Sequence, residues 1–197
     1  MAVEELKIQM RSVALIAGLL CLTACGGNDV PSPSEREAKG LTAPNPEVED
    51  EILLNGKGLK AGAEGFFFGA GQNEAIGSTT KLLGDPVRTA SNDECGAGPM
   101  ASSDFAGGLT LNFQNGVLVG WLWQMPREGD AAPVVPISLQ SDTQLGTSRA
   151  DLEATDGYLA IPDSTLGEEF SLGDAIGGFV EGDAVSMLYS GTQCFFR

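Results

Sequence analysis

The sequence predicts an α+β fold, an antiparallel sheet with short helices and one disulfide. Glycine accounts for 27 of the 197 residues, about twice the usual ~7%, and is spread along the chain, which indicates many turns and short strands. Hydrophobic residues make up 42% of the chain, enough for a core. Two central apolar runs flank an Asn-Gly pair, the strongest local signal for a hairpin. We therefore expect a single α+β domain over residues 52–197.

The first half of this domain is predicted to begin with a helix over residues 72–83. Ile76 and Leu83 lie seven residues apart within a narrow apolar stripe, and Gly84-Asp85-Pro86 ends the segment. The hairpin follows at residues 109–123, with Asn115-Gly116 as a type I′ turn. Alternation places Leu109, Leu111 and Phe113 on one face, together with Val117, Val119, Trp121 and Trp123. The two tryptophans fit either a core or a ligand platform, and the core is favoured.

The second half repeats this order after a proline-rich connector over residues 126–136. Ser148 and Asp151 resemble a capping box at the start of a short helix that ends by Gly157. Aligning Phe68-Gly69 with Leu145-Gly146 gives an offset of 77 residues, which suggests two tandem helix-plus-sheet repeats in halves 52–125 and 137–197. Strands are expected at residues 158–161, 166–172, 176–180 and 184–189.

The composition excludes several classes of function. The chain has no histidine, so it has no Ser-His-Asp triad, no Cys-His pair and no His-ligated metal site. Its net charge of −16 argues against nucleic acid as a partner. We expect no cofactor and no bound metal. The Ser78-x-x-Lys81 spacing matches a motif of penicillin-recognising serine enzymes, but the accompanying motifs are missing, so an exposed helix face is the better interpretation.

The amino terminus reads as an export signal. Residues 12–24 contain no charge and follow Lys7 and Arg11, and the run is too short for a ~20-residue membrane span. It ends in Leu22-Thr23-Ala24-Cys25, followed by glycine, which resembles the lipobox of bacterial lipoproteins. An ordinary secretory signal is the alternative. Glu4 and Glu5 are unusual in such a signal, so Met10 is a candidate for the true translation start.

The lipobox resemblance implies a location and an anchor. Residues 1–24 would be removed as a signal peptide, Cys25 would carry a diacylglycerol, and its new amino group would receive an acyl chain such as palmitate. Residues 25–51 hold four prolines and many acids, which predicts a disordered stalk. The chain would then be a membrane-anchored protein of the cell envelope, facing the periplasm. Gly26 after the cysteine favours the outer over the inner membrane.

Removal of the signal and lipidation of Cys25 leave two cysteines, Cys95 and Cys194. Exported proteins form disulfides in an oxidising compartment, and the two residues lack the C-x-x-C spacing of a redox pair. We expect a Cys95–Cys194 bridge that ties a loop of the first half to the end of the second.

Short motifs resemble the helix-plus-sheet unit of BamE/SmpA-type lipoproteins and of β-lactamase-inhibitor-like proteins. These motifs are Phe68-Gly69, Leu83-Gly84-Asp85-Pro86 and Phe113-Gln114-Asn115-Gly116. The stretches at residues 94–99 and 194–197 also resemble uncharacterised bacterial lipoproteins. The sequence thus favours a non-enzymatic binding or assembly module for an envelope protein or surface component. A carboxylate-based hydrolase of envelope polymers is the alternative.

Overall fold

The computed structural model describes residues 50–195 as two β-sheets with two α-helices and a short 3-10 helix η1. The predicted α+β class, with its antiparallel sheet, short helices and disulfide, is confirmed. In chain order the elements are β1 (Ile52–Asn55), β2 (Gly58–Ala61), β3 (Glu64–Phe67), α2 (Gln72–Leu83), β4 (Arg88–Asn92), β5 (Met100–Asp104), η1 (Ala106–Gly108), β6 (Leu109–Gln114), β7 (Val117–Gln124), β8 (Ile137–Leu139), α3 (Arg149–Glu153), β9 (Tyr158–Ile161), β10 (Glu168–Leu172), β11 (Ile176–Glu181) and β12 (Ala184–Gly191).

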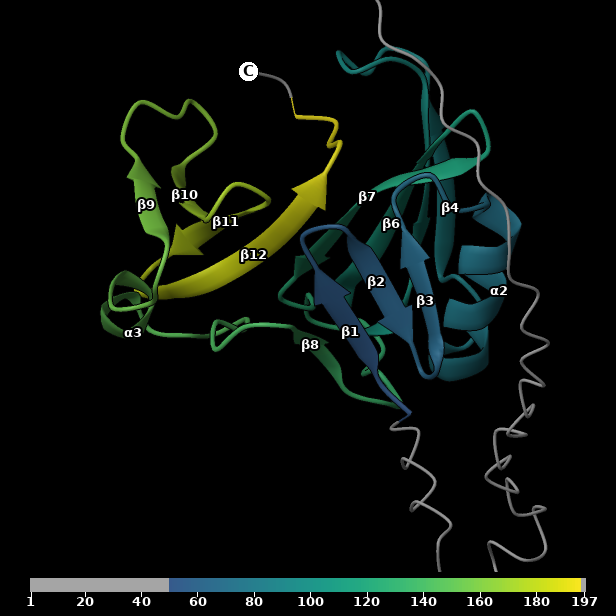
Figure 1. The fold of residues 1–197 in the computed structure, drawn as a ribbon, viewed down its shortest axis with the longest axis horizontal. Coiled ribbons are helices and arrows are strands. Elements are labelled where there is room, and N and C mark those ends of the chain that lie inside the picture. Colours follow the sequence, from purple (N-terminus) through teal and green to yellow (C-terminus); the bar gives the residue numbers. More distant parts are fainter. Residues whose placement is uncertain (1–49, 196–197) are drawn as a thin grey trace, which may run out of the picture. The chain divides into compact units, whose positions relative to one another are not determined.

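The larger sheet has eight antiparallel strands in the order β4-β5-β6-β7-β12-β11-β10-β9. It therefore consists of two four-stranded meanders that meet through β7 and β12, the last strand of each (Figure 1). The smaller sheet has the order β3-β2-β1-β8, in which β8 is parallel to β1. Sequence reasoning missed β3, β4, β5 and β8, because their residues lack a clear apolar alternation.

Backbone hydrogen bonds show that the two halves are repeats. Gly69 N–H donates to Leu118 O in the first half, and Gly146 N–H donates to Val185 O in the second, both at 2.8 Å. The return bonds, Leu118 N–H to Ala70 O and Val185 N–H to Thr147 O, are also equivalent. Gly69 and Gly146 are 77 residues apart (146 minus 69), the offset expected from the sequence. The equivalent segments are residues 69–124 and 146–191.

A β-bulge recurs at the same place in each repeat. The pairing register shifts at Asn112/Phe113 against β7 and at Phe179/Val180 against β12. A bulge places two residues of one strand opposite one residue of its partner. In β7 it turns Leu118 to the same face as Trp121, so Leu118 is buried whereas Val117 and Val119 are half-buried. The predicted placement of Val117 and Val119 on the apolar face was wrong because simple alternation takes no account of a bulge.

One face of the large sheet, here called the inner face, forms the core. Its fully buried side chains come from both halves, and β2 and α2 pack against β7 (Figure 1). The Trp121 indole N–H donates to Asn55 O at 2.9 Å, and the Trp123 N–H donates to Gly107 O at 3.1 Å. The core position of both tryptophans is confirmed. The inner face includes Leu109, Leu111, Phe113, Leu118, Trp121, Trp123, Phe170, Val180, Val185 and Leu188.

The two helices differ in length and in how they begin. α2 spans 12 residues and starts after Gly71, which supplies no side-chain cap. α3 spans five residues and starts after Ser148, whose hydroxyl accepts a hydrogen bond from the Asp151 N–H. The predicted bounds of α2 and the predicted cap of α3 are both confirmed. Leu152 of α3 is buried in the core. The helix lies beside β12 and β9 (Figure 1).

Candidate functional site

The face of the large sheet opposite the core, here called the open face, carries the candidate site. Residues paired across neighbouring strands share a face, so the register defines two rows that cross the junction between the halves. One row runs through Gln124, Met187, Phe179, Glu169 and Ile161. The other runs through Arg88, Asp104, Thr110, Leu122, Tyr189, Gly177, Ser171 and Leu159.

Three aromatic rings from these rows and the carboxyl-terminal segment form an aromatic cluster, namely Phe179, Tyr189 and Phe195. The Phe195 ring meets Tyr189 edge-on with centroids 5.0 Å apart, and meets Phe179 edge-on at 5.7 Å. Phe179 and Tyr189 lie 5.8 Å apart. Edge-to-face pairs at these separations add stability beyond area burial. All three rings remain half-buried.

A buried carboxylate fixes the position of Tyr189. The Tyr189 hydroxyl donates to Glu169 Oε1 at 2.5 Å, and Glu169 is only 2% exposed. The ring lies across Gly177, where a Cβ would collide with it. Glycine at this position therefore lets the tyrosine lie flat on the open face and reach the carboxylate.

The aromatic cluster borders an apolar cavity of about 390 Å³. Leu166, Phe179, Met187 and Phe195 supply its apolar walls, and Glu168 and Glu181 lie at its acidic edge. Apolar walls with a few polar groups are typical of binding pockets. This arrangement can accept an apolar side chain or small apolar group that is followed by a positive charge.

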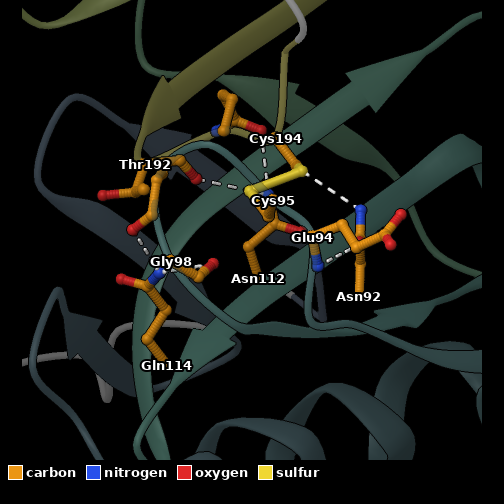
Figure 2. The surroundings of a disulfide bond; sticks show 10 residues. Asn92, Glu94, Cys95, Gly98, Asn112, Gln114, Thr192 and Cys194 are labelled. Carbon is orange, nitrogen blue, oxygen red and sulfur yellow. Dashed lines mark hydrogen bonds between the residues drawn. A yellow bond between two sulfur atoms is a disulfide. The ribbon is translucent and has the colours of Figure 1, made fainter.

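The carboxyl-terminal segment, residues 192–195, lies across the open face and is covalently held there. Cys194 forms a disulfide with Cys95, with Cα atoms 5.4 Å apart, as predicted (Figure 2). The Asn92 amide donates to Cys194 Sγ at 3.3 Å, and the Asn112 amide donates to Gln193 Oε1 at 2.8 Å. Since Cys95 belongs to the β4–β5 loop, the bridge joins the first repeat to the end of the second and holds Phe195 in the aromatic cluster.

The predicted lipobox, Leu22, Thr23, Ala24 and Cys25, lies outside the described residues. Among residues 50–195, no group of three His, Cys, Asp or Glu side chains is placed to hold a metal ion. No helix in this described part is long and apolar enough to cross a bilayer.

The Ser78-x-x-Lys81 motif is engaged by a glutamate, and its predicted exposure was only partly correct. Ser78 is buried and its hydroxyl donates to Glu64 on β3, while Lys81 is exposed and lies 3.6 Å from the same carboxylate. The hydroxyl, and next the lysine charge, hold the pKa of Glu64 below its usual range. The motif therefore ties α2 to β3.

A second charged cluster ties α3 to the sheet. Arg149 donates through Nη2 to Glu168 Oε2 at 2.8 Å and through Nε to Asp183 Oδ1 at 3.1 Å. These bonds lower the pKa of Glu168 and raise that of Arg149. The cluster is solvent-accessible, and both carboxylates are engaged by the guanidinium.

Sequence reasoning missed the aromatic cluster and Glu169. Phe179 and Tyr189 were expected only as strand residues, because nothing local indicates which face of a strand stays uncovered. The sequence signal that could have indicated the cluster is the Cys194-Phe195 pair, because a disulfide from Cys194 to Cys95 holds Phe195 close to the sheet.

Comparison with protein-family models, with curated proteins and with solved structures finds no match to this chain. The resemblance to BamE/SmpA-type and β-lactamase-inhibitor-like units stays a prediction.

Proposed function

We propose that the chain is a lipid-anchored protein of the bacterial cell envelope that acts as a non-enzymatic binding module. The anchor is supported by the short apolar run before Leu22-Thr23-Ala24-Cys25. The Cys95–Cys194 disulfide supports an exported location, because such bonds persist in oxidising compartments. Outer-membrane delivery remains favoured by Gly26.

The observation that carries the binding role is the half-buried aromatic cluster beside the apolar cavity on the open face. Ordered aromatic rings offer a large contact area at a low cost in side-chain entropy, and they are enriched at interfaces. The cluster is pre-organised because the disulfide holds Phe195 and Glu169 holds Tyr189. Glu181 at the cavity edge favours a partner that presents an apolar group together with a positive charge, whereas Glu168 is already paired with Arg149.

The carboxylates near the aromatic cluster favour binding over hydrolysis. Glu169 is buried under Tyr189, and Glu168 and Asp183 meet around Arg149. A pair of carboxylates that cleaves a glycosidic bond must face a substrate from both sides. These three carboxylates accept hydrogen bonds from other residues of the same chain.

The anchor is tested by Cys25→Ser in cells that express the whole chain. Wild-type protein is expected to partition into the detergent phase with membranes, and C25S is expected to move to the aqueous phase. Cys95→Ser is the matched control because it removes a cysteine that carries no lipid. Equal detergent partitioning of wild type and C25S would rule out the anchor.

The binding role is tested by a photo-reactive amino acid at Met187, which lines the cavity. A crosslinker at Glu74 on the exposed side of α2 is the control. Irradiation of intact cells is expected to give a discrete adduct from position 187 and none from position 74, and C25S should abolish the adduct. Identical adducts from both positions would contradict a specific site on the open face.

A further inference from the structure

The eight-stranded sheet ends in two edge strands, β4 and β9, that occupy equivalent positions in the two repeats. Arg88 pairs with Asp104 as Leu159 pairs with Ser171, and Thr89 pairs with Ser103 as Ala160 pairs with Phe170. The fold therefore imposes the same backbone geometry on both edges. Differences between the two edges come from the side chains.

The β4 edge is polar, whereas the β9 edge is apolar. β4 reads Arg-Thr-Ala-Ser-Asn, and Arg88 is fixed to Asp104 by a 2.6 Å ion pair. β9 reads Tyr-Leu-Ala-Ile, and Leu159, at the position of Arg88, is 65% exposed. Natural edge strands are protected by short length, charges, proline or bulges. β9 is short and is followed by Pro162, but its four residues include no charge, no proline and no bulge. Because β4 shows that the same position accepts a charge, the apolar character of β9 is not required by the fold.

The unpaired side of β9 presents the N–H and C=O of Ala160, whereas the Tyr158 N–H already donates to Thr155 O at 3.1 Å. Gly173 N–H donates to Gly157 O at 2.9 Å, which marks their pair as hydrogen-bonded. Such pairs alternate along an antiparallel ladder, so Leu159 and Ile161 bond to β10 while the Ala160 N–H and C=O point away from it. Ala160 is itself exposed. The edge can thus form a pair of backbone hydrogen bonds with one more strand at Ala160.

A cavity of about 230 Å³ lies beside this edge and can receive a side chain of an added strand. Its walls include Tyr158, Ala160, Phe170 and Val180, with Glu168 at the margin. When a peptide adds to a sheet edge, main-chain bonds supply affinity and pockets for alternate side chains supply specificity. An apolar side chain fits this cavity, and Glu168 at its margin is already paired with Arg149.

Charge decides which kind of strand can pair with β9. Asp156 precedes the strand by two residues, Asp163 follows it by two, and Glu153 ends the adjacent helix α3. In a two-fold pairing of β9 with itself about Ala160, Asp156 of one copy would lie near Asp163 of the other. Like charges opposed across strands are destabilising. An extended segment with basic ends would instead be attracted.

We propose that β9 is a docking edge that receives an extended segment of a partner protein as a ninth strand, with alternating apolar residues and a Lys or Arg at each end. The β9 cavity lies next to the cavity of the aromatic cluster, with which it shares Gly167, Glu168 and Val180, but none of the three clustered rings lines it. This interface does not depend on the lipid anchor. The exposed Leu159, the outward Ala160 amide and the acids at both ends of β9 carry the inference together.

The test starts from a random heptapeptide display library selected against the immobilised disulfide-bonded protein. Enriched peptides are expected to alternate apolar residues between basic ends. Their affinity should fall at least tenfold for Ala160→Pro, which removes the outward N–H yet is compatible with an edge strand. Leu159→Arg, which copies the residue at the equivalent β4 position, should cause a similar loss. Thr89→Pro, at the equivalent position of β4, removes an N–H from the opposite edge of the sheet and should bind as wild type does.

Folding and binding site are followed on the same samples. Each variant is compared with wild type by circular dichroism and melting temperature, and L159R alone suffices if A160P fails to fold. Amide hydrogen exchange should slow at Ala160 when a selected peptide is bound. The proposal is overturned if no peptide is enriched, if enriched peptides bind both variants equally, or if light scattering shows a dimer that L159R dissociates, since the occupant is then a second copy.

Discussion

The two repeats have the same strand pairing but differ in the elements that pack on the inner face of the large sheet. In the first half the inner face lies under β2 and the 12-residue α2, and it carries Trp121 and Trp123. In the second half the five-residue α3 is the helical cover, and the equivalent positions are Leu188 and Ser190. The same bulge and the same strand-to-strand bonds occur in both. The inner-face side chains are therefore larger in the half that is covered by β2 and the longer helix. The backbone pairing is the same in both halves and determines the fold.

The largest expected effect comes from the core position where this difference is greatest. Trp121→Ala should lower the free energy of unfolding by about 3–5 kcal/mol, because it opens a cavity and leaves Asn55 O without its donor. Leu188→Ala, at the equivalent position of the second half, should cost about 2–4 kcal/mol. Both are measured by urea unfolding.

Leu122→Ala is the control for this comparison, since Leu122 belongs to the same strand but faces the open side. Its loss should be the smallest of the three. Equal losses for Trp121→Ala and Leu188→Ala would contradict the inferred difference between the two halves.

The second effect concerns the link between the halves. Replacing Cys95 and Cys194 by serine removes a bridge that spans 99 residues and should cost about 2–4 kcal/mol. It should also release Phe195 from the aromatic cluster, which near-ultraviolet circular dichroism and fluorescence quenching report. Reduction of the wild-type bridge should reproduce both changes. An unchanged urea midpoint in both experiments would show that the halves hold together without it.

Local sequence signals correctly predicted the elements whose ends are marked by turn-forming or helix-ending residues. Residues 72–83 formed the predicted helix because Gly84 and Pro86 end it, and Asn115-Gly116 formed the predicted turn with positive φ at both residues. The offset of 77 residues matched the residues that precede the two helices, whereas the equivalent strands β6 and β11 begin 67 residues apart (176 minus 109). The cysteine count identified the disulfide.

Features that depend on residues far apart in the chain could not be predicted from local sequence patterns. β4 is polar and is a strand only because β5 pairs with it. Leu118 is buried because a bulge turns it inward, and the Phe195 contacts arise from segments far apart in the chain. Which face of a sheet stays open depends on packing that no single strand encodes.

The third effect concerns how each helix begins. Ser148→Ala removes the α3 cap and should cost about 1 kcal/mol. Gly71→Ser should instead supply a cap to α2, because Gly71 has extended φ and ψ, and the nearest group to an added Cβ is the flexible end of Glu74. The expected gain is a few tenths of a kcal/mol. Thermal unfolding of both variants checks the opposite signs, and a destabilised Gly71→Ser would contradict the proposed cap.

The smallest effect is a pH dependence to which both halves contribute. Glu64 ties α2 to β3 through Ser78 and Lys81, and Glu168 ties α3 to the sheet through Arg149, so both carboxyl groups have lowered pKa values. A lowered pKa in the folded state means that stability is fully present above the unfolded value of about 4.3 and is lost as pH falls through the folded value. Glu64→Gln and Glu168→Gln should each flatten the fall of melting temperature between pH 5 and pH 3. Salt should weaken both contributions, because these groups are exposed to solvent. If the double variant loses stability on acidification as steeply as wild type, other carboxylates govern the acid transition, and these two do not tie the helices through charge.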